Sequence, residues 1–125
     1  LPAAGSPWMA NPALNCPAVV QPETQGDERS VYLLYAHLQQ QPLVKVGESI
    51  TCGQVLGVVG QTGNALAPHL HLEIRVGSSG WQPVSMAHYT NDASMDEMGQ
   101  YCTWRVTGTF QHVDPLQWLD GFPTP

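Results

Sequence analysis

Hydrophobic residues in the first two thirds of the chain fall into short runs that are separated by glycines. The longest runs cover residues 31–38 and 69–76, and shorter ones cover residues 44–46, 49–51 and 55–59. β-Branched and aromatic residues in runs of this length are typical of strands. Short strands with glycine between them predict an all-β fold, either a sandwich or a barrel.

The pattern becomes helical in the last third of the chain. Ser94 and Glu97 have the spacing of a capping box, so a helix is predicted over Met95–Val106. Asp114 before Pro115 provides an N-cap and a proline at the first helical position, so a short terminal helix follows.

We therefore expect a β-rich domain over residues 1–86 and a helical extension over residues 87–125. The extension should pack on the β-rich part through its large apolar side chains, which are Trp104, Leu116 and Trp118.

The run over residues 69–76 aligns four ionisable side chains. Side chains alternate between the two faces of a strand, so these four share one face and four aliphatic residues share the other, which we expect to be the core face. The ionisable set is His69, His71, Glu73 and Arg75, and the aliphatic set is Leu70, Leu72, Ile74 and Val76. Two histidines at this spacing indicate a metal site, and two partly exposed histidines without a ligand are the alternative.

Three other histidines are present. His37 ends the run over residues 31–38, on the same face as Tyr35, and a lone histidine at a strand end is usually structural. His88 and His112 have no patterned partner, so we interpret both as structural or surface residues.

Charge restricts the function further. Four Lys and Arg residues against ten Asp and Glu residues give a formal net charge of −6. Binding to nucleic acid or to an anionic membrane surface depends on basic side chains, so neither is expected. The longest fully apolar run, residues 31–36, is far too short to span a membrane. The chain starts at Leu1 without a signal peptide, which suggests a processed form or a fragment.

The cysteines leave the redox compartment open. Cys16, Cys52 and Cys102 allow one disulfide at most, and each of the three pairings is possible. No Cys-x-x-Cys occurs, so a cysteine zinc site is not indicated. A Gly-x-Ser-x-Gly nucleophile motif and a Gly-x-x-x-x-Gly-Lys phosphate loop are also absent from the sequence.

Five blocks in the middle of the chain, in this order, resemble the second half of the lysostaphin/LytM-type zinc metallopeptidase domain. They are Tyr35-Ala36-His37-Leu38, Val44-Lys45-Val46-Gly47-Glu48, Gly53-Gln54-Val55-Leu56-Gly57, Val59-Gly60-x-Thr62-Gly63-Asn64 and Pro68-His69-Leu70-His71-Leu72-Glu73. The resemblance implies an antiparallel β-sandwich with the histidines on the floor of a groove. It also implies a secreted or cell-envelope protein that cleaves peptide bonds in peptidoglycan.

The same resemblance implies roles for three residues. His71 matches a zinc ligand of the family, and His69 and His37 match its two catalytic histidines. Zinc would be the cofactor, because it lowers the pKa of its bound water and polarises the scissile carbonyl.

The chain departs from the family at the other two zinc ligands, which come from an upstream His-x-x-x-Asp motif. No histidine precedes His37 in this chain. We expect the missing ligands on an upstream segment or a second chain, with Asp27 or Asp92 as less favoured replacements. The alternative is a LytM-like module that has lost zinc and binds the cell wall or regulates a cell-wall hydrolase.

A biotinyl or lipoyl carrier is disfavoured, because Lys45 lies in a predicted strand rather than a hairpin turn.

Overall fold

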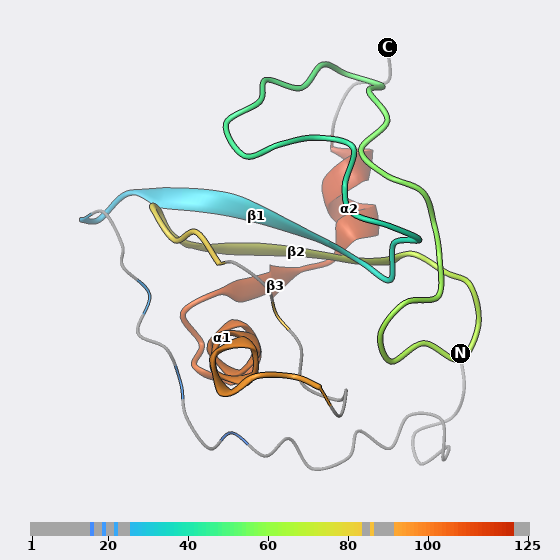
Figure 1. Ribbon diagram of the computed structural model, residues 1–125. Helices are drawn as coiled ribbons and strands as arrows, with labels where there is room; N and C mark the ends of the chain where they lie inside the picture. The colour runs from blue at the N-terminus through green and yellow to red at the C-terminus, as the bar shows by residue number, and fades with distance from the viewer. Residues whose placement is uncertain are drawn as a thin grey trace.

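The structure is a computed structural model of the 125-residue chain (Figure 1), and it describes residues 16, 19, 22, 26–83, 86 and 92–121. Within this part, three strands form an antiparallel sheet and two helices lie in the C-terminal third. The elements are β1 (Arg29–Ala36), β2 (His71–Ser78), α1 (Met95–Val106), β3 (Gln111–Val113) and α2 (Pro115–Asp120).

Strand β2 is the centre of the sheet. It pairs along its whole length with β1, from Arg29 opposite Ser78 to Ala36 opposite His71. On its other side it pairs with the short β3, where Arg75 lies opposite His112. This register places the first residue of β2 next to the last residue of β1, so the chain segment that follows β1 begins beside His71.

The long connection between β1 and β2 differs from the sequence prediction. No strand forms over residues 44–46, 49–51 or 55–59, and only two isolated bridges occur there, Leu38 with Val59 and Gly60 with His69. A strand needs a continuous partner for its backbone N–H and C=O groups. In the described part of the chain this segment has only scattered backbone hydrogen bonds, so the three predicted strands are wrong.

The more buried face of β2 is the ionisable one, which reverses the predicted orientation. The Glu73 and Arg75 side chains are buried, whereas Leu70 is exposed. Of the aliphatic set, Ile74 is buried and Leu72 and Val76 are partly exposed. The prediction failed because a carboxylate and a guanidinium that bond each other can be buried together.

The core lies on the ionisable face of the sheet, between it and α1. Its buried members are Trp81, Trp104 and Phe110, with Tyr32 and Leu34 of β1 packed against them. Tyr32 and Leu34 lie directly opposite Arg75 and Glu73 in the register, and directly opposite residues share a face. The outer face exposes other β1 side chains, namely Val31, Leu33 and Tyr35.

Both predicted helices form. Ser94 and Glu97 make the capping box in front of α1, and the Asp114 side chain accepts the backbone N–H of Leu116 at the start of α2. Trp104 is buried as predicted and Trp118 is partly exposed, but Leu116 is exposed, so its expected packing is wrong. A six-residue helix has too few turns to cover much of the sheet with one apolar stripe.

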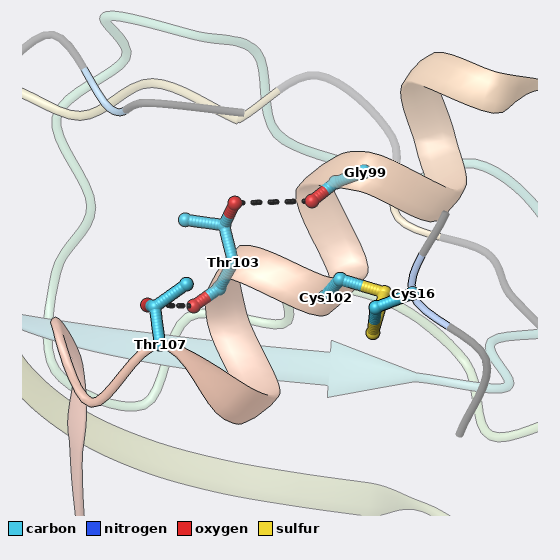
Figure 2. The surroundings of a disulfide bond; sticks show 5 residues. All are labelled: Cys16, Gly99, Cys102, Thr103 and Thr107. Atoms are coloured by element: carbon cyan, nitrogen blue, oxygen red, sulfur yellow. Dashed lines mark hydrogen bonds between the residues drawn. A yellow bond between two sulfur atoms is a disulfide. The ribbon is translucent and has the colours of Figure 1, made fainter. Parts of the chain in front are cut away.

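A disulfide joins Cys16 to Cys102 in α1, so Cys52 is the odd cysteine and is exposed. Figure 2 shows the bond on the helix, next to Thr103, whose hydroxyl donates to the carbonyl oxygen of Gly99 at 3.0 Å. Thr107 repeats this pattern one turn later, donating to the carbonyl oxygen of Thr103 at 2.7 Å. The disulfide therefore ties Cys16 covalently to the helix that covers the core.

The described residues form an antiparallel sheet with two short helices, which agrees with the predicted all-β class and the helical extension. A second sheet is not part of the described ranges. None of the helices there has the length and apolar character that crossing a bilayer requires.

Candidate active site

The site begins at an unusual backbone conformation. His37 has φ 62°, the only positive φ of a non-glycine residue among those described. Strict alternation after Ala36, which lies opposite His71, would turn the next side chain to the other face of the sheet. The left-handed conformation breaks that alternation, and the His37 ring instead lies 5.8 Å from the ring of His71, centroid to centroid.

The three histidines that the sequence singled out therefore meet. The His37 ring centroid lies 4.7 Å from that of His69. His69 precedes β2 rather than belonging to it, and its position is held by the bridge to Gly60, whose carbonyl oxygen accepts the His69 backbone N–H at 3.1 Å. The structure thus brings His37, His69 and His71 to one end of the sheet, where β1 ends and β2 begins.

Hydrogen bonds fix which ring nitrogen carries the proton. Nδ1 of His37 donates to the carbonyl oxygen of Thr62 at 2.7 Å, and Nδ1 of His69 donates to that of Ala67 at 2.7 Å. A carbonyl oxygen only accepts, so in both neutral rings Nε2 carries the lone pair. His71 is the reverse, because its Nε2 donates to the Glu73 carboxylate at 2.8 Å and Nδ1 carries the lone pair.

Glu73 is the centre of a buried polar network under the sheet. One of its oxygens accepts from His71, and the other accepts from Nε of Arg75 at 2.9 Å and from the indole N–H of Trp104 at 2.8 Å. Burial alone would raise the pKa of Glu73, but the hydrogen bonds from His71, Trp104 and Arg75, together with the Arg75 charge, outweigh it and lower the pKa. The carboxylate is therefore ionised and accepts from every one of these donors.

A second set of contacts holds the loop beside His37. The Thr62 hydroxyl donates to the carbonyl oxygen of Leu38 at 2.6 Å, while the Thr62 carbonyl oxygen accepts from His37. Gly60 and Gly63 allow the loop to approach: a Cβ at Gly60 would lie 2.5 Å from the backbone of Gln39, and Gly63 has φ 68°. The Gly-x-Thr-Gly segment thus contacts residues 37 and 38 through both the side chain and the backbone of Thr62.

The described residues do not form a complete zinc site. Among them, no group of three or more His, Cys, Asp or Glu side chains is placed to hold a metal ion. A catalytic zinc normally has three protein ligands. His71 has the geometry of one, because a carboxylate holds its Nε2 and leaves Nδ1 for a metal ion. The described part of the chain therefore fits zinc only with further ligands.

One His-x-x-x-Asp spacing does occur in the chain, from His88 to Asp92, on the C-terminal side of the five blocks. No such spacing lies upstream of His37, where the family has its motif. Asp92 is exposed, and His88 lies outside the described residues. His112 is exposed in β3, as predicted.

Sequence analysis missed two contributors. The first is Trp104, which it treated only as a packing residue. A buried indole N–H needs an acceptor, and Glu73 on the neighbouring strand was the available one. The second is the left-handed conformation of His37, for which the sequence contains no direct signal.

The chain is similar in sequence to known proteins. The model of peptidase family M23 matches residues 19–85. The peptidoglycan DD-endopeptidase ShyC of Vibrio cholerae is 50% identical over 42 residues, which cover 34% of this chain and 10% of that protein. The DD-carboxypeptidase/endopeptidase Mpg of Neisseria meningitidis is 40% identical over 57 residues, which cover 46% of this chain and 13% of that protein.

The chain thus spans about an eighth or less of the length of these relatives. No solved structure matches it significantly. The family match contains all three grouped histidines and the Gly-x-Thr-Gly loop that contacts His37. Because the family model covers more than half of the 125 residues, this chain belongs to peptidase family M23.

Proposed function

We propose that the protein to which this chain belongs is a zinc metalloendopeptidase that hydrolyses peptide bonds of peptidoglycan. The observation that carries the proposal is the grouping of His37, His69 and His71, with ring centroids 4.7 and 5.8 Å from that of His37. The names of the relatives supply the substrate class. Zinc, when bound, supplies a water of lowered pKa and polarises the scissile carbonyl.

The three histidines have different parts in this proposal. His71 is a zinc ligand through Nδ1, because Glu73 occupies its Nε2. His37 and His69 each hold an Nε2 lone pair that accepts a proton or, once protonated, donates to a developing oxyanion. The carbonyl oxygens of Thr62 and Ala67 keep these two rings in the same tautomer.

The remaining ligands come from outside the described residues. We propose an upstream His-x-x-x-Asp segment, or the same motif from a second chain, as their source. That segment would also supply the second sheet of the β-sandwich and cover the exposed outer face of β1, where Val31, Leu33 and Tyr35 lie.

The Cys16–Cys102 disulfide supports a cell-envelope or extracellular location, because disulfides persist in oxidising compartments. Peptidoglycan, the substrate of the proposed reaction, lies in the same compartment.

The test uses the complete protein, with its natural upstream segment. Zinc content is measured by elemental analysis, and hydrolysis by mass spectrometry of fragments released from purified cross-linked peptidoglycan. We expect one zinc per chain and the release of fragments cleaved at a peptide bond, both lost in His71→Ala. The 125-residue chain alone should bind zinc poorly and release no fragments. A complete protein that remains zinc-free when zinc is supplied and releases nothing contradicts the proposal.

The second candidate is a zinc-free module that binds peptidoglycan or regulates a hydrolase, and the lack of a three-ligand metal group among the described residues favours it. Retention of all three family histidines in one place favours the enzyme, because a module that has lost zinc has no chemical need for them. A complete protein that sediments with peptidoglycan but lacks zinc and activity would identify the binding module. A His88→Ala variant serves as a control, since zinc binding through an upstream motif does not depend on it.

A further inference from the structure

Helix α1 is connected to the site by a hydrogen-bonded path through Trp104. The indole N–H of Trp104 donates to one oxygen of Glu73 at 2.8 Å, and the other oxygen of the same carboxylate accepts from Nε2 of His71 at 2.8 Å. Helix α1 begins at Met95, beyond the residues 19–85 that the family model matches. A segment outside the matched domain therefore contacts the group that orients a site histidine.

The Trp104 and Glu73 part of the path is buried, whereas the His71 side chain is 39% exposed. Trp104 is 2% exposed and stacks with Trp81 and Phe110. Arg75 secures it from the strand: its Nη1 donates to the carbonyl oxygens of Trp104 and Phe110, at 2.8 and 3.1 Å, and its guanidinium lies 5.0 Å from the Trp104 ring. Contacts to the backbone carbonyl oxygen and to the ring thus both hold Trp104 in place.

We propose that α1 is a positioning element of the site, in which Trp104 acts through Glu73 to hold the His71 ring with Nε2 protonated and the Nδ1 lone pair open. The importance of this arrangement for catalysis depends on the proposed function, because His71 is the zinc ligand there. Trp104 and Glu73 are positioning residues and contact no substrate atom in this scheme.

The arrangement makes an unusual prediction for Glu73→Gln. Trp104 and Arg75 both donate to the same carboxylate oxygen, so that position has to remain an oxygen. The amide nitrogen of the glutamine is then placed on the other side, facing Nε2 of His71. An amide nitrogen only donates, so Nε2 of His71 must accept and the proton moves to Nδ1. The substitution should therefore invert the tautomer of one histidine without removing it.

The test is nuclear magnetic resonance of the 125-residue chain with ¹⁵N-labelled histidine, at a pH where the imidazoles are neutral. Nitrogen shifts and ring correlations report which nitrogen of His71 is protonated. We expect Nε2–H in the parent chain and Nδ1–H in Glu73→Gln. A parent chain with His71 protonated at Nδ1 overturns the proposal by itself, without any variant. An unchanged tautomer in a folded Glu73→Gln chain also overturns it.

Trp104→Phe tests the contribution of the helix, because phenylalanine retains a stacked ring and removes the indole N–H. We expect the His71 Nε2 proton to exchange with water roughly tenfold faster than in the parent, since a hydrogen bond to a charged carboxylate is lost. Trp81→Phe is the matched control: Trp81 stacks on Phe110, 4.4 Å between centroids, and is not among the described donors to Glu73. Equal exchange in all three chains, or equal acceleration by both substitutions, contradicts a specific role for Trp104. Neither readout involves zinc or hydrolysis. Failure of the positioning role therefore does not contradict the proposed function, and failure of the proposed function does not contradict the positioning role.

Discussion

The ring of His37 lies 4.7 Å from the ring of His69 although 31 residues of irregular chain separate them. The left-handed backbone at His37 and the bridge between Gly60 and His69 bring the two rings together. The short distance between the rings depends on backbone geometry at both ends of the loop. Substitutions can therefore distinguish the role of the imidazole in turnover from the role of the backbone conformation in stability.

His37→Asn removes the imidazole but suits the backbone, because asparagine tolerates positive φ better than most other non-glycine residues. In the complete protein we expect turnover to fall about 10²- to 10⁴-fold, the typical contribution of a general acid or base, with zinc content unchanged. Peptidoglycan hydrolysis and elemental analysis measure the two quantities. The matched His37→Val variant should in addition lower the melting temperature, because a β-branched residue is strained at φ 62°. Full turnover in His37→Asn would exclude a catalytic role for this histidine.

Substitutions of His69 and His71 should have different effects on the zinc content of the complete protein. His71→Ala is expected to lose zinc, because it removes a ligand whose orientation Glu73 fixes. His69→Ala is expected to retain zinc and lose turnover. Elemental analysis of both complete variants distinguishes the two roles, and the opposite pattern would show that the assignments are exchanged.

The Thr62 hydroxyl should matter for the position of His37. Thr62→Ala removes its 2.6 Å hydrogen bond to the Leu38 carbonyl, at an expected cost of about 1 kcal/mol in unfolding free energy. Thr62→Ser keeps the hydroxyl and should restore most of the loss. Denaturant unfolding of the 125-residue chain measures the free energy. Equal destabilisation by alanine and serine would assign the effect to the lost methyl group instead.

The two arginines near Glu73 should contribute unequally to the free energy of unfolding, because only Arg75 forms a buried ion pair with it. Arg75→Met leaves the carboxylate without its closest cation in a buried setting, so we expect a loss of about 3–5 kcal/mol. Arg105 lies 3.9 Å from Glu73 and is partly exposed, so Arg105→Met should cost no more than about 1 kcal/mol. Denaturant unfolding of both variants is the measurement, and similar losses would contradict the central role given to Arg75.

Reduction of the disulfide should destabilise the chain. Cys16 and Cys102 are 86 residues apart, and a cross-link over a loop of this size reduces the entropy of the unfolded chain by the equivalent of about 4–5 kcal/mol. Thermal unfolding with and without reductant tests this expectation. Cys52→Ser is the control, because the exposed Cys52 lies outside the bond. This variant should have the same unfolding temperature as the parent chain in each of the two conditions.

The sequence alone determined the features that depend on local chemistry. The capping box at Ser94 and Glu97 and the N-cap at Asp114 specify the helix starts, because a cap needs only a few neighbouring residues. The alternation along β2 correctly placed His71, Glu73 and Arg75 on one face, because pleating is a property of a single strand. The Tyr-Ala-His-Leu and His-Leu-His blocks singled out the three histidines whose rings the structure groups together.

Tertiary structure decided which face of the strand is buried, and which side of the sheet His37 occupies. Glu73 and Arg75 are buried because Trp104, 29 residues beyond Arg75, supplies a donor to one and an acceptor to the other, and no local pattern encodes that partner. The apolar segment over residues 55–59 is not a strand in the described chain, because strand formation depends on a neighbouring backbone as well as on propensity. His37 joins His71 only because one residue adopts a left-handed conformation, which the surrounding contacts with Thr62 and Leu38 hold in place.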